Sequence, residues 1–159
     1  MVMKDLFHDV TIQEWISPIS CAAKANFDTA AGATPVDTQG YESVMFILQA
    51  QAAGAAPNAV FTLAASDTTI AANAGAAQTD PLLCQVHRDD GLDTTGITIS
   101  ATNVLTYAGD SAADGHAVIF RYTGPLRYVR LNCTSSTANA TNFACTVIKS
   151  KGRRMPTVV

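Results

Sequence analysis

The chain has 159 residues, a length that fits one compact domain and excludes an assembly of three. Charged residues make up 14% of the chain, against about 25% in an ordinary soluble domain, so much of its surface must be uncharged. The formal net charge is −3, and no basic segment is interleaved with aromatic residues. Nucleic acid is therefore not expected as a partner.

The charges are distributed unevenly along the chain. All thirteen acidic residues and three of the ten cations precede residue 115, which gives residues 1–114 a net charge of −10 and residues 115–159 a net charge of +7. Within one β-sandwich these charges can cancel. They can also form contacts between a basic surface on one subunit and an acidic surface on its neighbour. At the level of sequence both interpretations stay open.

Residues 1–35 are less regular than the rest of the chain. Val10-Thr11-Ile12 is typical of a short strand, Trp15 and Ile16 are bulky and apolar, and Pro18 ends any helix. This segment predicts an N-terminal arm or an edge strand.

Patterns of period two predict strands along most of the remaining chain. Residues 37–40, Asp-Thr-Gln-Gly, fit a turn in which Gly40 adopts a positive φ before Tyr41 begins a strand. Residues 42–51 carry apolar side chains on both faces, as in a strand that is covered on both sides within a sandwich or at a subunit contact. The further predicted strands are 60–66, 82–87, 97–106, 117–122, 127–134 and 142–150.

The last two predicted strands have matching apolar faces. One face of the first holds Val129, Leu131 and Cys133, and one face of the second holds Phe143, Cys145 and Val147. A turn centred near residue 139 predicts a hairpin whose apolar faces meet the same core. Cys133 and Cys145 are then either two small buried hydrophobes, which a reducing cytoplasm favours, or a cross-strand disulfide.

The strands together predict an all-β, single-domain antiparallel β-sandwich. We expect a body at residues 36–150, the arm or edge segment at residues 1–35, and a basic C-terminal tail at residues 151–159. Lys149, Lys151, Arg153 and Arg154 lie within six residues and leave the final strand with a glycine and a proline. Such a tail is either frayed or an arm that becomes ordered on a negatively charged partner.

Motifs of the common enzyme classes do not occur in the chain. There is no G-x-S-x-G, no phosphate-binding G-x-x-x-x-G-K-[ST], no G-x-G-x-x-G and no H-E-x-x-H. The cysteines form no C-x-x-C pair, and the acidic cluster at residues 89–93 lacks the pattern of a calcium-binding loop. We therefore expect a protein that is not an enzyme and that binds no cofactor or metal ion.

Neither a membrane span nor a secretory signal is expected. The longest uncharged run, residues 43–66, contains glutamine, proline and asparagine near its middle, where a bilayer would leave polar groups unsatisfied. The first residues contain Lys4, Asp5 and Asp9 in place of a continuous apolar stretch. We expect a protein made in the cytoplasm.

Two motifs carry a resemblance to a known family. Residues 35–46 read Pro-Val-Asp-Thr-Gln-Gly-Tyr-Glu-Ser-Val-Met-Phe, and residues 126–131 read Leu-Arg-Tyr-Val-Arg-Leu. The pair resembles small virion proteins of tailed bacteriophages, in which a VDT-x-GYES motif leads into one strand and a K/R-R-Y-V-R strand lies near the C-terminus. Where those relatives carry a longer acidic turn, this chain has Ser66-Asp67-Thr68-Thr69 followed by alanine-rich sequence.

The resemblance implies a β-sandwich with jelly-roll-like connectivity that acts as a capsid decoration or cement protein on the outer head shell. Its partners would be the major capsid protein and copies of itself, as a dimer or trimer, and it would lie on the virion surface after synthesis in the bacterial host. The residues expected to contact a partner are Trp15, Arg127, Tyr128, Arg130, Lys149, Lys151, Arg153 and Arg154. The alternatives are a tail, neck or fibre component of the virion, or a carbohydrate-binding β-sandwich module.

Overall fold

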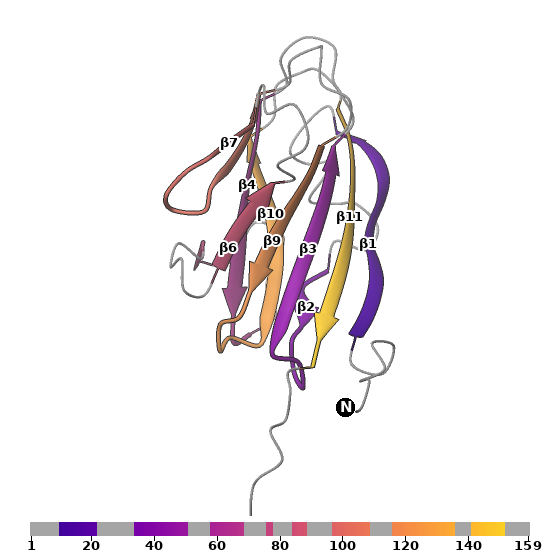
Figure 1. Ribbon diagram of the computed structural model, residues 1–159, viewed down its shortest axis with the longest axis vertical. Coiled ribbons are helices and arrows are strands. Elements are labelled where there is room, and N and C mark those ends of the chain that lie inside the picture. The colour runs from indigo at the N-terminus through magenta and orange to yellow at the C-terminus, as the bar shows by residue number, and fades with distance from the viewer. Residues whose placement is uncertain are drawn as a thin grey trace, which may run out of the picture.

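The structure, a computed structural model, describes residues 10–21, 34–50, 58–68, 76–77, 84–88, 97–108, 116–135 and 141–151. Every regular element within these ranges is a strand (Figure 1). The strands are β1 (Val10–Cys21), β2 (Val36–Asp37), β3 (Ser43–Ala50), β4 (Asn58–Ser66), β5 (Ala76–Ala77), β6 (Cys84–Arg88), β7 (Ile97–Ile99), β8 (Leu105–Ala108), β9 (His116–Tyr122), β10 (Tyr128–Ser135) and β11 (Thr141–Ser150).

These strands form two antiparallel sheets that lie face to face, so the predicted all-β sandwich is confirmed. Sheet A has the order β1-β11-β3-β9-β6. Sheet B has the order β2-β10-β4-β8-β7, and β5 pairs with β4 beside this path. In Figure 1 the strands of sheet A lie in front of β4 and β10. Strands β1 to β4 alternate between the two sheets, and so do β8 to β11.

Alternate side chains of the central strands fill the space between the sheets. Sheet A contributes Val44, Phe46 and Leu48 from β3 and Phe143, Cys145 and Val147 from β11, and sheet B contributes Phe61, Leu63 and Ala65 from β4 and Val129, Leu131 and Cys133 from β10. The rings of Phe61 and Phe143 meet across the two layers at 5.1 Å in a T-shaped contact. The interdigitated core fixes the position of the two sheets relative to each other.

The predicted hairpin between the last two strands is wrong. β10 pairs with β4 and β2 in sheet B, whereas β11 pairs with β1 and β3 in sheet A. The apolar faces of both strands do meet one core, as predicted, but they do so across the sandwich and not side by side. Cys133 and Cys145 are both buried free cysteines, which confirms the favoured interpretation and excludes the disulfide.

The predicted strand at residues 97–106 is two short strands, β7 and β8, joined by a turn. The Ser100 N–H donates to the carbonyl of Val104 at 2.9 Å, and the Ser100 hydroxyl oxygen accepts hydrogen bonds from the N–H groups of Thr102 and Val104. Asn103 adopts a φ of 59°, a conformation that asparagine tolerates better than most residues. The left-handed backbone conformation of Asn103 reverses the direction of the chain, so that β7 can pair with β8.

β1 is an edge strand of sheet A, as the sequence indicated, and it is longer than the three residues of the predicted short strand. Its pairing with β11 shifts register between Glu14 and Ile16 and again between Ile16 and Ile19. Pro18 lies within the second irregularity. Proline has no N–H to donate to a neighbouring strand, so an edge strand with an interrupted ladder accommodates it.

Candidate functional site

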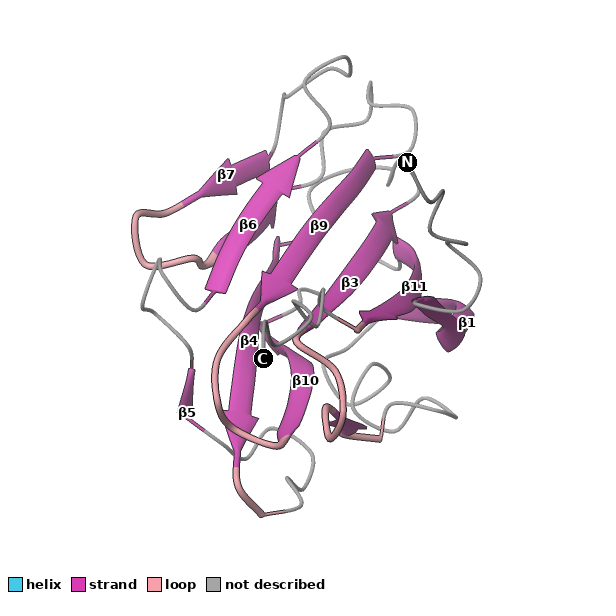
Figure 2. Ribbon diagram, turned by 60° about the horizontal axis from the view of Figure 1, so that its bottom comes forward, coloured by secondary structure: helices cyan, strands magenta, loops and turns pink. Residues whose placement is uncertain are grey.

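β3 and β10 begin, and β4, β9 and β11 end, at the end of the sandwich that lies at the bottom of Figure 1. The loops at this end line an open groove. We call it the end groove. It has a volume of about 730 Å³ and is lined by residues 38–42, residues 123–125 and Arg127. In Figure 2 this end comes forward, and the lining segments appear as the loops between β2 and β3 and between β9 and β10.

A tight turn forms the first wall of the end groove. The Tyr41 N–H donates to the carbonyl of Thr38 at 2.9 Å and closes the turn. Gly40 has a φ of 83°, which confirms the positive φ expected from the sequence. A side chain at this position would strain the backbone, so glycine is required for the turn that leads into β3.

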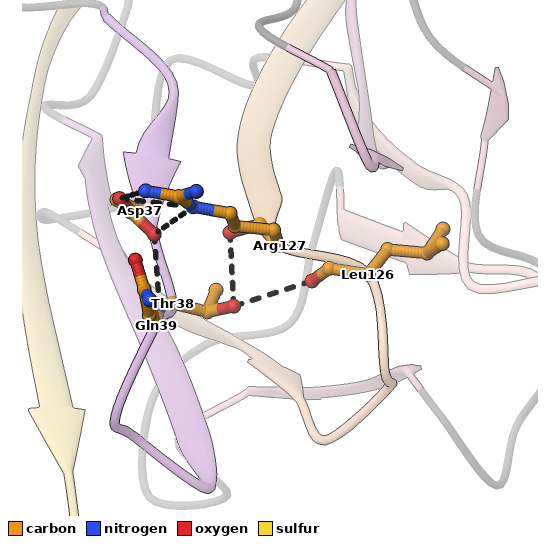
Figure 3. A network of polar contacts seen from close by, with 5 residues as sticks. All are labelled: Asp37, Thr38, Gln39, Leu126 and Arg127. Carbon is orange, nitrogen blue, oxygen red and sulfur yellow. Dashed lines mark hydrogen bonds and ion pairs between the residues drawn. The ribbon is translucent and has the colours of Figure 1, made fainter.

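An ion pair joins this turn to the start of β10. Nη2 of Arg127 lies 2.8 Å from Oδ2 of Asp37, and Nε of Arg127 lies 3.1 Å from Oδ1 and 3.2 Å from Oδ2 (Figure 3). Oδ1 also accepts a hydrogen bond from the Gln39 N–H at 2.9 Å. These bonds, with that to Arg127 the strongest, lower the pKa of Asp37 to about 2, so this carboxylate remains charged well into the acid range.

Thr38 makes a second connection between the same two segments. Its N–H donates to the carbonyl of Arg127 at 2.8 Å. Its hydroxyl donates to the carbonyls of Arg127 at 2.9 Å and Leu126 at 3.2 Å, as Figure 3 shows. The adjacent residues of β2 pair with Val129 and Tyr128 of β10. The two motifs that carry the resemblance are thus neighbours in space, although about 90 residues separate them in the sequence.

The opposite wall is held from below by a buried tyrosine. The Leu126 N–H donates to the hydroxyl oxygen of Tyr122 at 3.0 Å, and Tyr122 is only 1% exposed. Gly124 packs so closely on the Tyr122 ring that a Cβ at this position would overlap the ring and its hydroxyl. Tyr122 therefore fixes the conformation of the 123–127 loop, through the hydrogen bond to Leu126 and the packing of Gly124 on its ring.

Two lysines flank an aromatic ring at the edge of the end groove. Nζ of Lys149 lies 4.6 Å from the centroid of the Tyr41 ring, and Nζ of Lys151 lies 5.9 Å from it. The Tyr41 hydroxyl forms a hydrogen bond with the Thr11 hydroxyl at 3.1 Å. That bond, assisted by the two ammonium charges, lowers the pKa of Tyr41. Both ammonium groups thus lie near the Tyr41 ring at the edge of the end groove.

The charges at this end are only partly compensated. Arg127, which lines the end groove, is neutralised by Asp37, and Glu42 is the acidic residue among the lining residues. Within the described ranges, no carboxylate forms an ion pair with Lys149 or Lys151. The site presents two ammonium groups against the one carboxylate of Glu42, together with an aromatic ring and turn backbone. The remaining positive charge suits a partner segment that carries carboxylates.

Four of the eight residues expected to contact a partner lie at this end. Arg127 and Lys151 are exposed, and Tyr128 and Lys149 are partly exposed. The guanidinium carbon of Arg127 lies 5.1 Å from the centroid of the Tyr128 ring. Arg153 and Arg154 lie outside the described residues.

Trp15 and Arg130 do not lie on an accessible surface. Trp15 is 2% exposed, donates from Nε1 to the carbonyl of Thr34 at 2.7 Å, and packs edge-on against Phe46 at 5.0 Å. Arg130 is 1% exposed. Bulk and charge suggested contact residues, but the fold uses the indole in the core of sheet A and buries the guanidinium on β10. Neither side chain is available to a partner in this conformation.

Thr38 and Tyr41 are site residues that the sequence analysis did not single out as partner contacts. Thr38 belongs to the turn predicted at residues 37–40, and Tyr41 is the residue predicted to begin the strand after it. Their contacts with Leu126, Thr11 and Lys149 join segments far apart in the chain. The available signal was a hydroxyl residue and an aromatic residue on either side of a turn glycine.

No group of three or more histidine, cysteine or acidic side chains in the described ranges could hold a metal ion. The same ranges contain no helix that is long and apolar enough to cross a membrane.

Comparisons of the chain with protein-family models, curated proteins and solved structures found no match.

Proposed function

We propose that this chain is a non-enzymatic structural protein of a tailed-bacteriophage virion, a decoration or cement protein that binds the outer surface of the head shell. The observation that carries the proposal is the junction of the two family-like motifs. Residues 36–43 and 126–131 pair through β2 and β10, and Asp37, Thr38 and Arg127 cross-link them beside the end groove. The motifs that resemble the virion family are thus joined into one surface by strand pairing, hydrogen bonds and an ion pair.

The partner in this proposal is the major capsid protein, contacted through an acidic segment. Lys149 and Lys151 supply the charge, and the chain continues from them towards Arg153 and Arg154. The Asp37 and Arg127 pair holds the wall of the end groove and adds no net charge. Such an interface gains specificity from charge complementarity, and its affinity falls as salt rises.

The proposal includes jelly-roll connectivity. Support comes from the strand orders β1-β11-β3-β9 and β2-β10-β4-β8, in which the first four and last four strands alternate between the sheets. A rolled pair of Greek keys produces this alternation. The loops between β2 and β3 and between β9 and β10 lie together at one end of the sandwich, and that end can face the shell.

Co-sedimentation with expanded, undecorated capsids of the encoding phage tests the proposal. We expect the full chain to bind at physiological salt and the double variant Lys149→Ala, Lys151→Ala to bind about tenfold more weakly, because two contacts of a charged rim are removed. The double variant Ala101→Glu, Thr102→Glu has the same net charge and alters an exposed turn elsewhere, so its binding should stay unchanged.

A full chain that fails to bind such capsids is not a decoration protein. Mass spectrometry of separated heads and tails then distinguishes a tail, neck or fibre component from a protein that is in neither particle. Reversing the charges of Lys151, Arg153 and Arg154 should lower occupancy on particles, and an unchanged occupancy excludes the tail from attachment.

A further inference from the structure

The two lysines at the edge of the end groove are neighbours that repel each other. Nζ of Lys149 lies 4.6 Å and Nζ of Lys151 lies 5.9 Å from the centroid of one ring, that of Tyr41. Like charges gathered around a single ring repel in water even at physiological salt, where the Debye length is about 8 Å. No carboxylate among the described residues pairs with either lysine to offset this repulsion. Their attraction to the ring is therefore the interaction that keeps them together.

The backbone beneath these lysines is fixed by its neighbours. The carbonyl of Ser150, which separates the two lysines in the chain, accepts a hydrogen bond from the Glu42 N–H at 3.0 Å. In the sheet, Lys149 pairs with Thr11 of β1. The backbone at the end of β11 is thus set by strand pairing and by this hydrogen bond, whereas the flexible four-carbon stems of the lysines are ordered only by what they touch.

Tyr41 is itself anchored at both of its ends. Its N–H donates to the Thr38 carbonyl at 2.9 Å, and its hydroxyl forms a hydrogen bond with the Thr11 hydroxyl at 3.1 Å. The side chain is partly buried. A ring held at its backbone and at its hydroxyl presents one fixed face, and the negative face of an aromatic ring attracts ammonium groups.

We infer that Tyr41 is a positioning residue of the end groove, which holds Lys149 and Lys151 in place for a partner segment that carries carboxylates. A lysine side chain loses rotamer freedom when it binds, and this loss weakens association. A side chain that is already ordered against a ring loses less. The inference rests on the proposed function and adds to it that the ring acts through the lysines, without contact of its own with the partner.

Replacement of the ring tests this role, because Tyr41→Leu leaves the net charge unchanged. We expect Tyr41→Leu to bind expanded, undecorated capsids of the encoding phage about threefold more weakly than the wild type in co-sedimentation isotherms. Tyr41→Phe keeps the ring and loses only the hydroxyl that bonds to Thr11, so it should bind as the wild type does. Equal weakening in both variants would overturn the inference, because the hydroxyl and not the ring would then be responsible.

A double-mutant cycle separates positioning from direct contact. The Lys149→Ala, Lys151→Ala protein has no ammonium group for the ring to hold, so the addition of Tyr41→Leu should weaken binding no further. A further threefold loss in that background would show that Tyr41 touches the partner or supports the fold, and would overturn the inference. A wild type that does not bind capsids refutes the proposed function as well, whereas a Tyr41→Leu variant that binds as tightly as the wild type refutes this inference alone.

Proton NMR of the free chain provides a measurement that needs no capsid. Aromatic ring currents move the resonances of protons above a ring upfield, so the ε-methylene protons of Lys149 and Lys151 should resonate upfield of their positions in the urea-unfolded chain. Tyr41→Phe should keep this shift, and Tyr41→Leu should remove it. Unshifted ε-methylene protons in the folded wild type would overturn the inference even if Tyr41→Leu failed to fold, because the lysines would then not be held on the ring.

Discussion

Replacement of Tyr122 by phenylalanine removes a hydrogen-bond acceptor beneath the end groove. The hydroxyl oxygen accepts the Leu126 N–H at 3.0 Å, and Tyr122 is 1% exposed. Gly124 lies directly against the ring, so little room is left for a water molecule to replace the hydroxyl. Without its acceptor, the partly buried N–H loses about 1–2 kcal/mol of stabilisation.

The corresponding change in thermal stability is measurable. For a domain of this size, about 1 kcal/mol shifts Tm by roughly 2–4 °C, so Tyr122→Phe should lower Tm by about 2–8 °C. Differential scanning calorimetry or circular dichroism records this shift. The 123–127 loop should also gain mobility, visible as faster amide exchange of Leu126, because that amide loses its acceptor.

Tyr41→Phe is the matched control for this experiment. It removes the same atom from a tyrosine whose hydroxyl bonds to Thr11 in an exposed position, where water can replace the lost partner. We expect no measurable change in Tm. Equal shifts for the two variants, or an unchanged Tm for Tyr122→Phe, would refute the reasoning that burial makes the Tyr122 hydroxyl structurally important.

Two further predictions follow from the titratable groups. The pKa of Asp37 is about 2 in the fold, below its ordinary 3.8, so the ionised carboxylate stabilises the fold above pH 3.8 and this stabilisation is lost as the pH falls from 3.8 towards 2. The urea midpoint of unfolding should therefore fall less steeply over this pH range in Asp37→Asn than in the wild type. Parallel curves for the two proteins would contradict the stabilising interaction of Asp37 with Arg127. Burial raises the pKa of the Cys145 thiol, and Cys133 is buried as well. Alkylation mapped by mass spectrometry should therefore spare both cysteines in the native protein and modify both in denaturant. Rapid labelling of either cysteine in the native protein would show that the core opens easily.

The sequence pattern predicts which face of each strand is apolar but not the strand that pairs beside it. Val129, Leu131 and Cys133 point into the core, and so do their counterparts on β11, as their spacing indicated. A hairpin and a pair of strands on opposite sheets both satisfy that spacing. Only the long-range ladders of β10 with β4 and of β11 with β3 distinguish the two arrangements.

Only part of the candidate site could be predicted, because charge is visible in the sequence whereas burial is not. Charge and position indicated Lys149, Lys151 and Arg127, which do lie near the end groove. The sequence alone does not show whether the side chains of Trp15 and Arg130 are buried or exposed. The burial of Trp15, for example, depends on Thr34 and Phe46, which the fold brings to it from distant parts of the sequence.

The irregular pairing of β1 has a consequence for behaviour at high local concentration. An exposed edge strand with a regular row of N–H and C=O groups is a template for adding strands from other molecules, which leads to fibres. In β1 the ladder shifts register twice, and Pro18 removes a donor within the second irregularity. Many molecules can therefore crowd together with this edge exposed without polymerising through it, and association is left to surfaces with specific side-chain chemistry.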